Sequence, residues 1–322
     1  MTRPIARPAN VPARTRRRQR PSSLLRSALL IALAVTCVFA LPTVLESVRA
    51  LRSSPAGGTA GGGGSGMAAG QVAMSGLQAG ACMALAPRGG EASKTVFIDP
   101  GHGGLDPGVV GAAGGQQVLE KNVTLAVAMR LASLLQADGY RVVLARTADT
   151  SVTMLAPTDS VTGALTAAAE HRDLVTRAAC ANAADASVLL SLHFNAFDDP
   201  SVGGAETYYD PARPFSAENK RLASDLQEAV VAALGTSDRG VWTDDQLAAP
   251  TLTTSGSLYG HLIELGPAEA GWVDAPSRMP GALVEPLFLT NPAEARVASS
   301  PSGQQRIAVA LQDGLNKFVG GA

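Results

Sequence analysis

Three side chains that can share a metal ion occur at the ends of predicted secondary-structure elements. His102 follows a short apolar run at 95–99, and His193 ends a second apolar run at 187–193; both runs predict buried strands. Glu120 begins the helical segment that follows the first run. The carboxyl ends of strands in an α/β sheet form a common edge, so these side chains can converge there. Two imidazoles and one carboxylate are the three-ligand set of a catalytic zinc site with a fourth position left for water.

Each of these residues also has an ordinary explanation. A His beside glycines is usually a surface-loop residue, and a Glu at the start of a helix interacts favourably with the helix dipole. The spacing does not define a metal site by itself, unlike His-Glu-x-x-His on one helix. The three residues taken alone therefore leave both interpretations open.

The elements that would position these residues alternate between strand and helix. A helical face repeats apolar residues from position 123 to 135 and ends at Gly139. The predicted strands are 95–99, 141–145, 187–193, 205–209, 258–264 and 281–285, and the predicted helices are 121–138, 170–184, 216–234 and 302–319. This alternation predicts one α/β domain over residues 94–322, with a mainly parallel or mixed central sheet and helices on both faces.

Charge is divided unevenly between the N-terminal segment and the rest of the chain. Residues 1–50 contain nine Arg and one acid, a net charge of +8, whereas the remainder has 17 basic and 26 acidic residues, a net charge of −9. An acidic body without a basic face is a poor partner for a polyanion, so nucleic acid is not an expected ligand. With 46% hydrophobic residues, the chain as a whole is not intrinsically disordered.

An uncharged run of 19 residues, 27–45, follows the Arg-rich segment 1–26. At about 1.5 Å per residue it is just long enough for a hydrocarbon core of roughly 30 Å, and its basic flank would stay in the cytoplasm. We therefore expect a basic cytoplasmic segment, a membrane anchor and an exported remainder. A cleaved signal peptide is the alternative, because Val38-Phe39-Ala40 offers small residues before a cleavage point. Both interpretations place the acidic body in the cell envelope, outside the cytoplasm.

Residues 46–93 are rich in Gly and Ala and are interpreted as a flexible linker. Cys82 lies in this segment, and Cys180 lies in the predicted helix 170–184. In an oxidising envelope the two could form a disulfide, and two buried free thiols are the alternative. Neither Cys lies near the candidate metal ligands in the sequence, which disfavours a Cys nucleophile.

Several short motifs follow one another in a recognisable order. They are Ile98-Asp99-Pro100-Gly101-His102-Gly103-Gly104, Glu120-Lys121-Asn122, Arg146, Arg172, Ala181-Asn182, Ser191-Leu192-His193-Phe194-Asn195-Ala196, Gly204-Ala205-Glu206-Thr207-Tyr208-Tyr209, and Ala282-Leu283-Val284-Glu285 before Phe288-Leu289-Thr290-Asn291-Pro292. In this order they resemble the motifs of the zinc-dependent N-acetylmuramoyl-L-alanine amidases of bacterial cell walls, over residues 95–319. The resemblance implies that His102, Glu120 and His193 bind Zn²⁺ and that Glu285 is the catalytic residue.

Two glutamates compete for the catalytic role. Glu264 lies in Leu262-Ile263-Glu264-Leu265-Gly266, which superficially resembles the closing motif of the family, but the downstream 288–292 segment favours Glu285. The sequence departs from the family where Pro286-Leu287 replaces a Gly-containing step. Because Pro fixes its own φ and restricts the preceding residue, the placement of Glu285 is left open.

The resemblance implies a peptidoglycan hydrolase that cleaves the amide between the lactyl group of N-acetylmuramic acid and L-Ala of the stem peptide. Zinc would lower the pKa of water toward about 7 and polarise the carbonyl, while Glu285 would accept the water proton and return it to the amine. One alternative is a catalytically inactive peptidoglycan-binding module on the same fold. Another is a different zinc hydrolase of the wall, such as a carboxypeptidase or a deacetylase.

The remaining features with possible roles are two His, one Asn and two Trp. His171 is expected at the surface, and His261 is expected to be structural or to contact substrate. Asn195 would share the face of His193 on an extended chain and could orient substrate. The long loops 147–169, 239–257 and 267–280 predict a segment flanking the groove, with Trp242 or Trp272 as a stacking wall and packing as the alternative for Trp272.

Overall fold

The computed structural model describes residues 70–90, 92–247 and 250–321, so the predicted anchor or signal segment 27–45 lies outside the described residues. These residues build an eight-stranded mixed sheet with the strand order β1-β2-β6-β3-β9-β14-β10-β11. The strands are β1 (Gly70–Gln71), β2 (Ala81–Leu85), β3 (Thr95–Pro100), β6 (Arg141–Arg146), β9 (Val188–Leu192), β10 (Ala205–Tyr209), β11 (Asp238–Thr243) and β14 (Gly281–Glu285). The four central strands β6, β3, β9 and β14 are parallel, whereas β2 and β10 are antiparallel to the neighbours that join them to this core. The predicted single α/β domain with a mixed sheet is confirmed.

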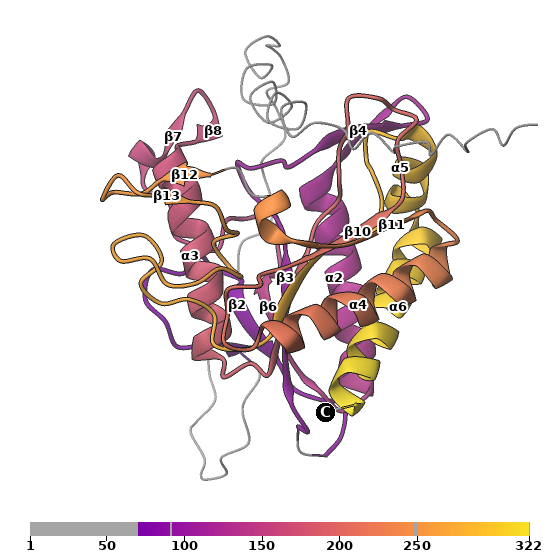
Figure 1. Cartoon of the computed structure of the whole chain (residues 1–322), viewed down its shortest axis with the longest axis horizontal. Coiled ribbons are helices and arrows are strands. Elements are labelled where there is room, and N and C mark those ends of the chain that lie inside the picture. The colour runs from indigo at the N-terminus through magenta and orange to yellow at the C-terminus, as the bar shows by residue number, and fades with distance from the viewer. Residues whose placement is uncertain (1–69, 91, 248–249, 322) are drawn as a thin grey trace, which may run out of the picture. The chain divides into compact units, whose positions relative to one another are not determined.

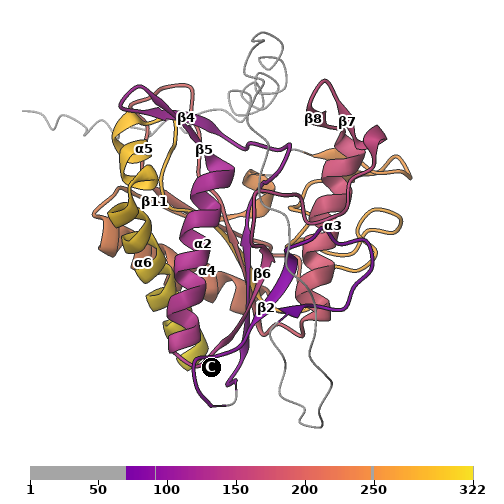
Figure 2. The same cartoon turned by 180° about the vertical axis from the view of Figure 1, so that it is seen from behind.

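Helices cover both faces of this sheet, as Figures 1 and 2 show from opposite sides. Helices α2 (Glu120–Ala137), α4 (Ser216–Leu234) and α6 (Pro301–Gly320) pack together on one face, and α3 (Ala167–Ala183) covers the other. The short helix α5 (Pro292–Ser299) precedes α6. The smaller elements are the hairpin β4 (Val110–Ala113) and β5 (Gln116–Leu119), η2 (Pro157–Asp159), β7 (Ser160–Val161), β8 (Ala164–Leu165), η3 (Asp244–Gln246), β12 (Thr251–Leu252) and β13 (Leu258–Tyr259).

Side-chain alternation along the central strands explains why both faces are covered. Val96 and Ile98 of β3 pack into the core shared with α2, α4 and α6, whereas Phe97 between them packs into the core that contains α3. Val284 and Leu283 of β14 divide in the same way. Strands buried on both faces are continuously apolar, and this is the pattern that predicts them from sequence.

Two expectations from the sequence need correction. The strand predicted at 258–264 is wrong: only β13 is extended, it pairs with β12 outside the main sheet, and the chain then turns through a bond from the Gly266 amide to the Leu262 carbonyl. The segment is apolar because it packs onto the α3 face, and a short apolar run does not distinguish a strand from a buried turn. The linker expected at 46–93 also contains β1 and β2, so the folded unit begins before residue 94.

A disulfide joins Cys82 in β2 to Cys180 in α3, with their Cα atoms 5.8 Å apart. This confirms the disulfide and excludes the two free thiols. It ties β2 to the helix that covers this face of the sheet, across a sequence separation of 98 residues.

Replacement of both cysteines by serine is expected to lower the free energy of unfolding by about 2–5 kcal/mol, because the crosslink restricts the unfolded chain over a long loop. Urea denaturation of the oxidised protein and the double variant measures this difference. The reduced wild-type protein serves as the control and should unfold with the variant. Equal midpoints for oxidised wild type and variant would show that the crosslink does not stabilise the fold.

Within residues 70–90, 92–247 and 250–321, no helix combines the length and the apolar character needed to cross a bilayer.

Candidate metal centre and active site

The three predicted metal ligands meet beyond the carboxyl ends of two adjacent parallel strands. Pro100 at the end of β3 lies opposite Leu192 at the end of β9, so His102 and His193 follow neighbouring strand ends. Glu120 is the first residue of α2. His102 Nε2 lies 3.0 Å from Glu120 Oε2, and His193 Nδ1 lies 3.1 Å from both Glu120 Oε1 and His102 Nε2. The structure therefore brings together all three residues predicted from the sequence.

This set of donor atoms fits a zinc ion. Two ligand atoms about 2.1 Å from zinc at a tetrahedral angle are about 3.4 Å apart, close to the distances found here. Both oxygens of the buried Glu120 are oriented by main-chain amides, from Val109 (2.7 Å) and Phe194 (2.8 Å). Burial alone would raise the pKa of Glu120, but His102 and His193 hold it well below its usual range. The carboxylate is thus kept ionised and aimed at the two imidazoles.

The surroundings of His102 favour a positive charge at this point. Burial alone would lower the pKa of His102, but the Glu120 and Asp106 carboxylates raise it to about 10. His102 Nδ1 lies 2.7 Å from Asp106 Oδ2, the carboxylate contact that commonly orients a metal-binding imidazole. With Nδ1 engaged, Nε2 is the nitrogen presented to the centre. Asp106 is absent from the residues predicted from the sequence; its position four residues after the candidate ligand His102 is the signal that could have identified it.

Two glycines make room for the ligands. A Cβ on Gly101 would lie 2.3 Å from ring atoms of His193, and a Cβ on Gly108 would lie 2.6 Å from both Glu120 Oε2 and His102 Cδ2. Any side chain at these positions would displace a ligand. Gly101 of the opening motif, and Gly108 beyond it, therefore have a steric role at the candidate metal centre.

Two buried arginines hold the loop that carries His102. Arg146 donates to the carbonyls of Pro100 and Gly101, each at 2.9 Å, and Arg177 donates to the carbonyl of His102 at 2.8 Å. His102 has a φ of +64°, a left-handed conformation that costs a non-glycine residue about 1–3 kcal/mol. The arginine contacts stabilise this unfavourable backbone geometry.

The assignment of Arg172 to the family's helix arginine is not supported by its position. Arg172 is about half exposed and pairs with Asp159 at 2.6 Å, whereas Arg177 is buried between Asp99 (2.6 Å) and Asp173 (2.8 Å). Burial alone would lower the pKa of Arg177, but Asp99 and Asp173 raise it above its usual value. Five residues along a helix correspond to a rotation of about 140°, so Arg172 points away from the loop that Arg177 contacts.

Glu285 ends β14 beside the candidate metal centre. Val284 pairs with Leu192, and the His193 amide donates to the Val284 carbonyl at 2.9 Å, so Glu285 lies next to a ligand across the ladder. Its side chain is 6% exposed, and Oε2 has no hydrogen-bond partner among the described residues. Burial, with Glu120 and Glu206 nearby, raises the pKa of Glu285 well above its usual value. With Pro286 next to it, this carboxyl group still lies close enough to Glu120 and His102 for both to shift its pKa.

Glu264 is a second buried glutamate near the candidate metal centre. It is 5% exposed, and its pKa is raised by burial and by Asp99, while Arg177 opposes the increase. Its electrostatic neighbours thus lie in β3 and α3, whereas those of Glu285 include the candidate ligands Glu120 and His102. Glu285 is thus the carboxyl group whose pKa is shifted by Glu120 and His102.

A cavity of about 180 Å³ opens on the α3 side of the sheet beside the two imidazoles. Its lining includes His102, His193, Asp99, Glu264 and Leu283. Neither Trp expected at a groove wall lines this cavity. Trp272 instead stacks on His171 with ring centroids 3.8 Å apart, and the Trp242 indole donates to the Arg239 carbonyl at 3.0 Å.

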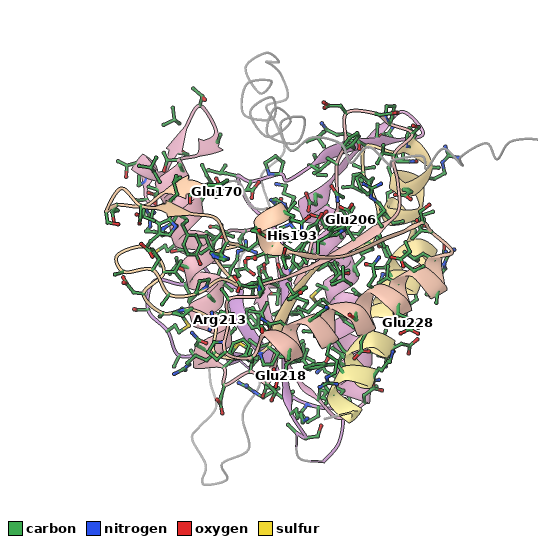
Figure 3. The ribbon with its side chains drawn as sticks, in the orientation of Figure 1. Glu170, His193, Glu206, Arg213, Glu218 and Glu228 are labelled. Carbon is green, nitrogen blue, oxygen red and sulfur yellow. A yellow bond between two sulfur atoms is a disulfide. The ribbon has the colours of Figure 1, made fainter. Side chains whose placement is uncertain are left out.

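Asn195 donates to Glu206 Oε2 at 2.7 Å rather than pointing freely into the cavity. Glu206 lies opposite Glu285 in the ladder, and Figure 3 shows it in the same region as His193. Tyr208 also donates to Glu206 Oε2 (2.6 Å), and Arg239 donates to Oε1 (2.7 Å). These bonds fix the carboxylate that faces Glu285, a role that the sequence analysis did not assign.

The steric role of Gly101 leads to a prediction. Gly101→Ala is expected to reduce catalytic efficiency by about 10²-fold, because a displacement of about 1 Å in a catalytic group has an effect of this size. Zinc affinity should fall with it, since His193 must move. Gly320→Ala is the matched control, because a Cβ there meets no atom within 4 Å. Steady-state kinetics and zinc titration of both variants check this, and wild-type values for Gly101→Ala would contradict the tight packing.

Comparison with known proteins identifies the family. A family model described as N-acetylmuramoyl-L-alanine amidase matches residues 96–317. The amidase LytC of Bacillus subtilis is 34% identical over 225 residues, which cover 70% of this chain but 35% of LytC, so the match spans about a third of that relative. The germination-specific amidase of the same organism is 30% identical, over 70% of this chain and 79% of its own length.

Solved structures agree in fold. The N-acetylmuramoyl-L-alanine amidase of Clostridium difficile 630 has a TM-score of 0.51 and 26% identity, with 71% of this chain and 98% of that chain covered. The CwlD amidase of Clostridioides difficile, solved with the GerS lipoprotein, has a TM-score of 0.55 and 24% identity, with coverage of 71% and 100%. Because the family model matches more than half of this chain, the chain belongs to the N-acetylmuramoyl-L-alanine amidase family of bacterial cell-wall hydrolases.

Proposed function

We propose that this protein hydrolyses the amide between N-acetylmuramic acid and L-Ala of peptidoglycan, with zinc held by His102, Glu120 and His193 and with Glu285 as the proton carrier. The observation that carries the proposal is the convergence of three side chains, with donor atoms 3.0–3.1 Å apart in each pair of residues. A buried carboxyl group with a raised pKa lies beside this centre, and a cavity opens onto it.

The roles of the residues follow from their surroundings. Zinc bound at this centre supplies Lewis acidity, which lowers the pKa of water toward about 7 and polarises the scissile carbonyl. Glu285 accepts the proton of the attacking water and then delivers it to the nitrogen of L-Ala as the C–N bond breaks. This second transfer is required because an unprotonated amine anion is a very poor leaving group. Burial favours the protonated form of Glu285, and this form is the one that donates the proton to the nitrogen of L-Ala.

The cell-wall relatives are consistent with action in the envelope, and the disulfide is consistent with an oxidising compartment. We propose that segment 27–45 directs export behind the basic segment 1–26 and that it either anchors the protein or is removed. Mass determination of the mature N-terminus distinguishes the two: an intact chain supports an anchor, and a start near residue 41 supports cleavage.

Product analysis tests the function. Digestion of purified peptidoglycan followed by mass spectrometry should yield glycan with free lactyl carboxylate and stem peptides that begin with L-Ala. Loss of a terminal amino acid would indicate a carboxypeptidase, and loss of acetyl groups would indicate a deacetylase. Zinc binding without any cleavage would support the inactive binding module.

A further inference from the structure

A second group of metal-binding residue types lies outside the centre described above. It consists of Asp210, Asp244 and His261, whose donor atoms lie within 4.8 Å of one another. Tyr209 at the end of β10 pairs with Thr243 at the end of the parallel strand β11, so Asp210 and Asp244 both stand one residue beyond paired strand ends. His261 follows β13 and reaches the same point from the loop. Two parallel strand ends and a loop therefore build this second cluster.

The side chains in this cluster are held with one donor atom turned inward. Asp210 Oδ1 accepts the Ala212 amide at 2.6 Å, and Asp244 Oδ2 accepts the Leu262 amide at 2.9 Å. The other oxygens, Asp210 Oδ2 and Asp244 Oδ1, are buried with His261 Nδ1, and none of the three has a partner in hydrogen-bonding geometry within the described residues. Both aspartates are fully buried, and His261 is about one quarter exposed. Such atoms are costly to bury unless something satisfies them.

The distances match those between ligands of one ion. His261 Nδ1 lies 2.8 Å from Asp210 Oδ2 and 3.5 Å from Asp244 Oδ1. Atoms about 2.1 Å from a first-row divalent cation are about 3.0 Å apart at octahedral angles and about 3.4 Å apart at tetrahedral angles. The observed distances of 2.8 and 3.5 Å lie on either side of these expected values. The direction of His261 Nδ1, in contrast, does not suit a hydrogen bond to either carboxylate.

The charge of the surroundings also favours a cation. Arg213 lies close enough to interact electrostatically with Asp210, and its guanidinium donates to the main-chain carbonyls of Gly266 and Ser277. Two fully buried aspartates share this place, and burial, with the Asp210 carboxylate nearby, raises the pKa of Asp244 to about 7. We propose that Asp210, Asp244 and His261 bind a second divalent first-row cation, Zn²⁺ or one of similar ligand preference.

The effect of this ion would be on the wall of the active-site cavity. The amide of Leu262 binds Asp244, and Leu262, Ile263, Glu264 and Leu265 all line the cavity beside His102 and His193. The cluster itself is separate from the catalytic centre: β10 runs antiparallel to β14, so Glu206 at its start faces Glu285 while Asp210 lies beyond its other end. A cation held there would fix the loop segment that forms this wall.

Metal stoichiometry of the full-length chain tests the proposal. The protein is stripped with chelator and titrated with Zn²⁺, with bound metal measured by calorimetry and elemental analysis. Wild type is expected to bind two equivalents, and the Asp210→Asn/Asp244→Asn double variant one. His102→Ala should also bind one, and the three changes together none. His171→Gln is the control and should bind two. One equivalent in wild type, lost in His102→Ala and unchanged in the double variant, would overturn the second site.

The same set of variants separates this proposal from the catalytic one, on which it does not depend. Two equivalents in His102→Ala with one in the double variant would reject the catalytic zinc and keep the second site. If the double variant does not fold, His261→Gln at the partly exposed position replaces it, with the same expected loss of one equivalent. Saturating Zn²⁺ should raise the melting temperature of His102→Ala by about 5–10 °C, and this increase should disappear when the aspartate changes are added.

Discussion

Glu285→Gln is expected to lower the rate of amide cleavage by about 10²–10⁴-fold, the usual contribution of a positioned acid–base group, with fold and zinc content unchanged. The substitution keeps the size of the side chain and removes its ability to carry a proton. The position beside His193 and the raised pKa of Glu285 are the observations behind this expectation. Rates measured on a defined muropeptide, with zinc analysis of the same sample, check it.

Glu264→Gln is the matched control for this prediction. Both glutamates are almost completely buried and both have raised pKa values, but Glu285 is the one whose pKa is shifted by Glu120 and His102. Glu264→Gln is expected to retain activity within about tenfold of wild type, an effect smaller than the loss of an acid–base group. A near-normal rate for Glu285→Gln together with inactive Glu264→Gln would transfer the catalytic role to Glu264.

Removal of a metal ligand has the other large expected effect. His102→Ala should lose the catalytic zinc and about 10³-fold or more in activity, because Lewis-acid stabilisation supplies several kcal/mol and each 1.4 kcal/mol corresponds to tenfold in rate. Metal analysis of the purified variant and its cleavage rate measure the two effects.

Asp106→Asn is expected to weaken metal binding less than His102→Ala does. Asp106 contacts His102 but is not a ligand, and loss of such a carboxylate typically weakens metal affinity by about 10–100-fold. His171→Ala, away from the centre, should behave as wild type in both assays. A His102→Ala protein that keeps its zinc and its rate would show that the three converging residues do not form the catalytic centre.

Prediction from sequence succeeded where the physical pattern is local. The strand at 281–285 is an apolar run that ends in Glu285, and the strand at 205–209 contains the β-branched and aromatic residues typical of strands; the observed bounds of both agree with the predicted ones. β2 was missed because Ala81-Cys82-Met83-Ala84-Leu85 lies in a Gly/Ala-rich stretch that gives little contrast. β11 was missed because its polar, Gly-containing sequence forms a partly exposed edge strand, where burial imposes no apolar pattern.

The candidate site also combines features with a local sequence pattern and features that depend on tertiary structure. Motif order is sufficient to propose His102, Glu120, His193 and Glu285. The contacts that hold the ligands depend on tertiary structure: Arg177 reaches the His102 carbonyl across 75 positions of sequence, and no spacing rule predicts that contact. His261 could not be joined to Asp210 and Asp244 from sequence, because their proximity follows from the pairing of β10 with the unpredicted β11.

The central claim, that this is a metal-dependent amidase, is tested most directly by one digestion experiment. Purified full-length protein is incubated with peptidoglycan as isolated, after chelation, and after chelation followed by Zn²⁺, and released stem peptides are quantified by mass spectrometry. We predict peptides beginning with L-Ala in the first sample, their loss in the second and their recovery in the third. Undiminished release of these peptides after complete removal of metal would contradict the account.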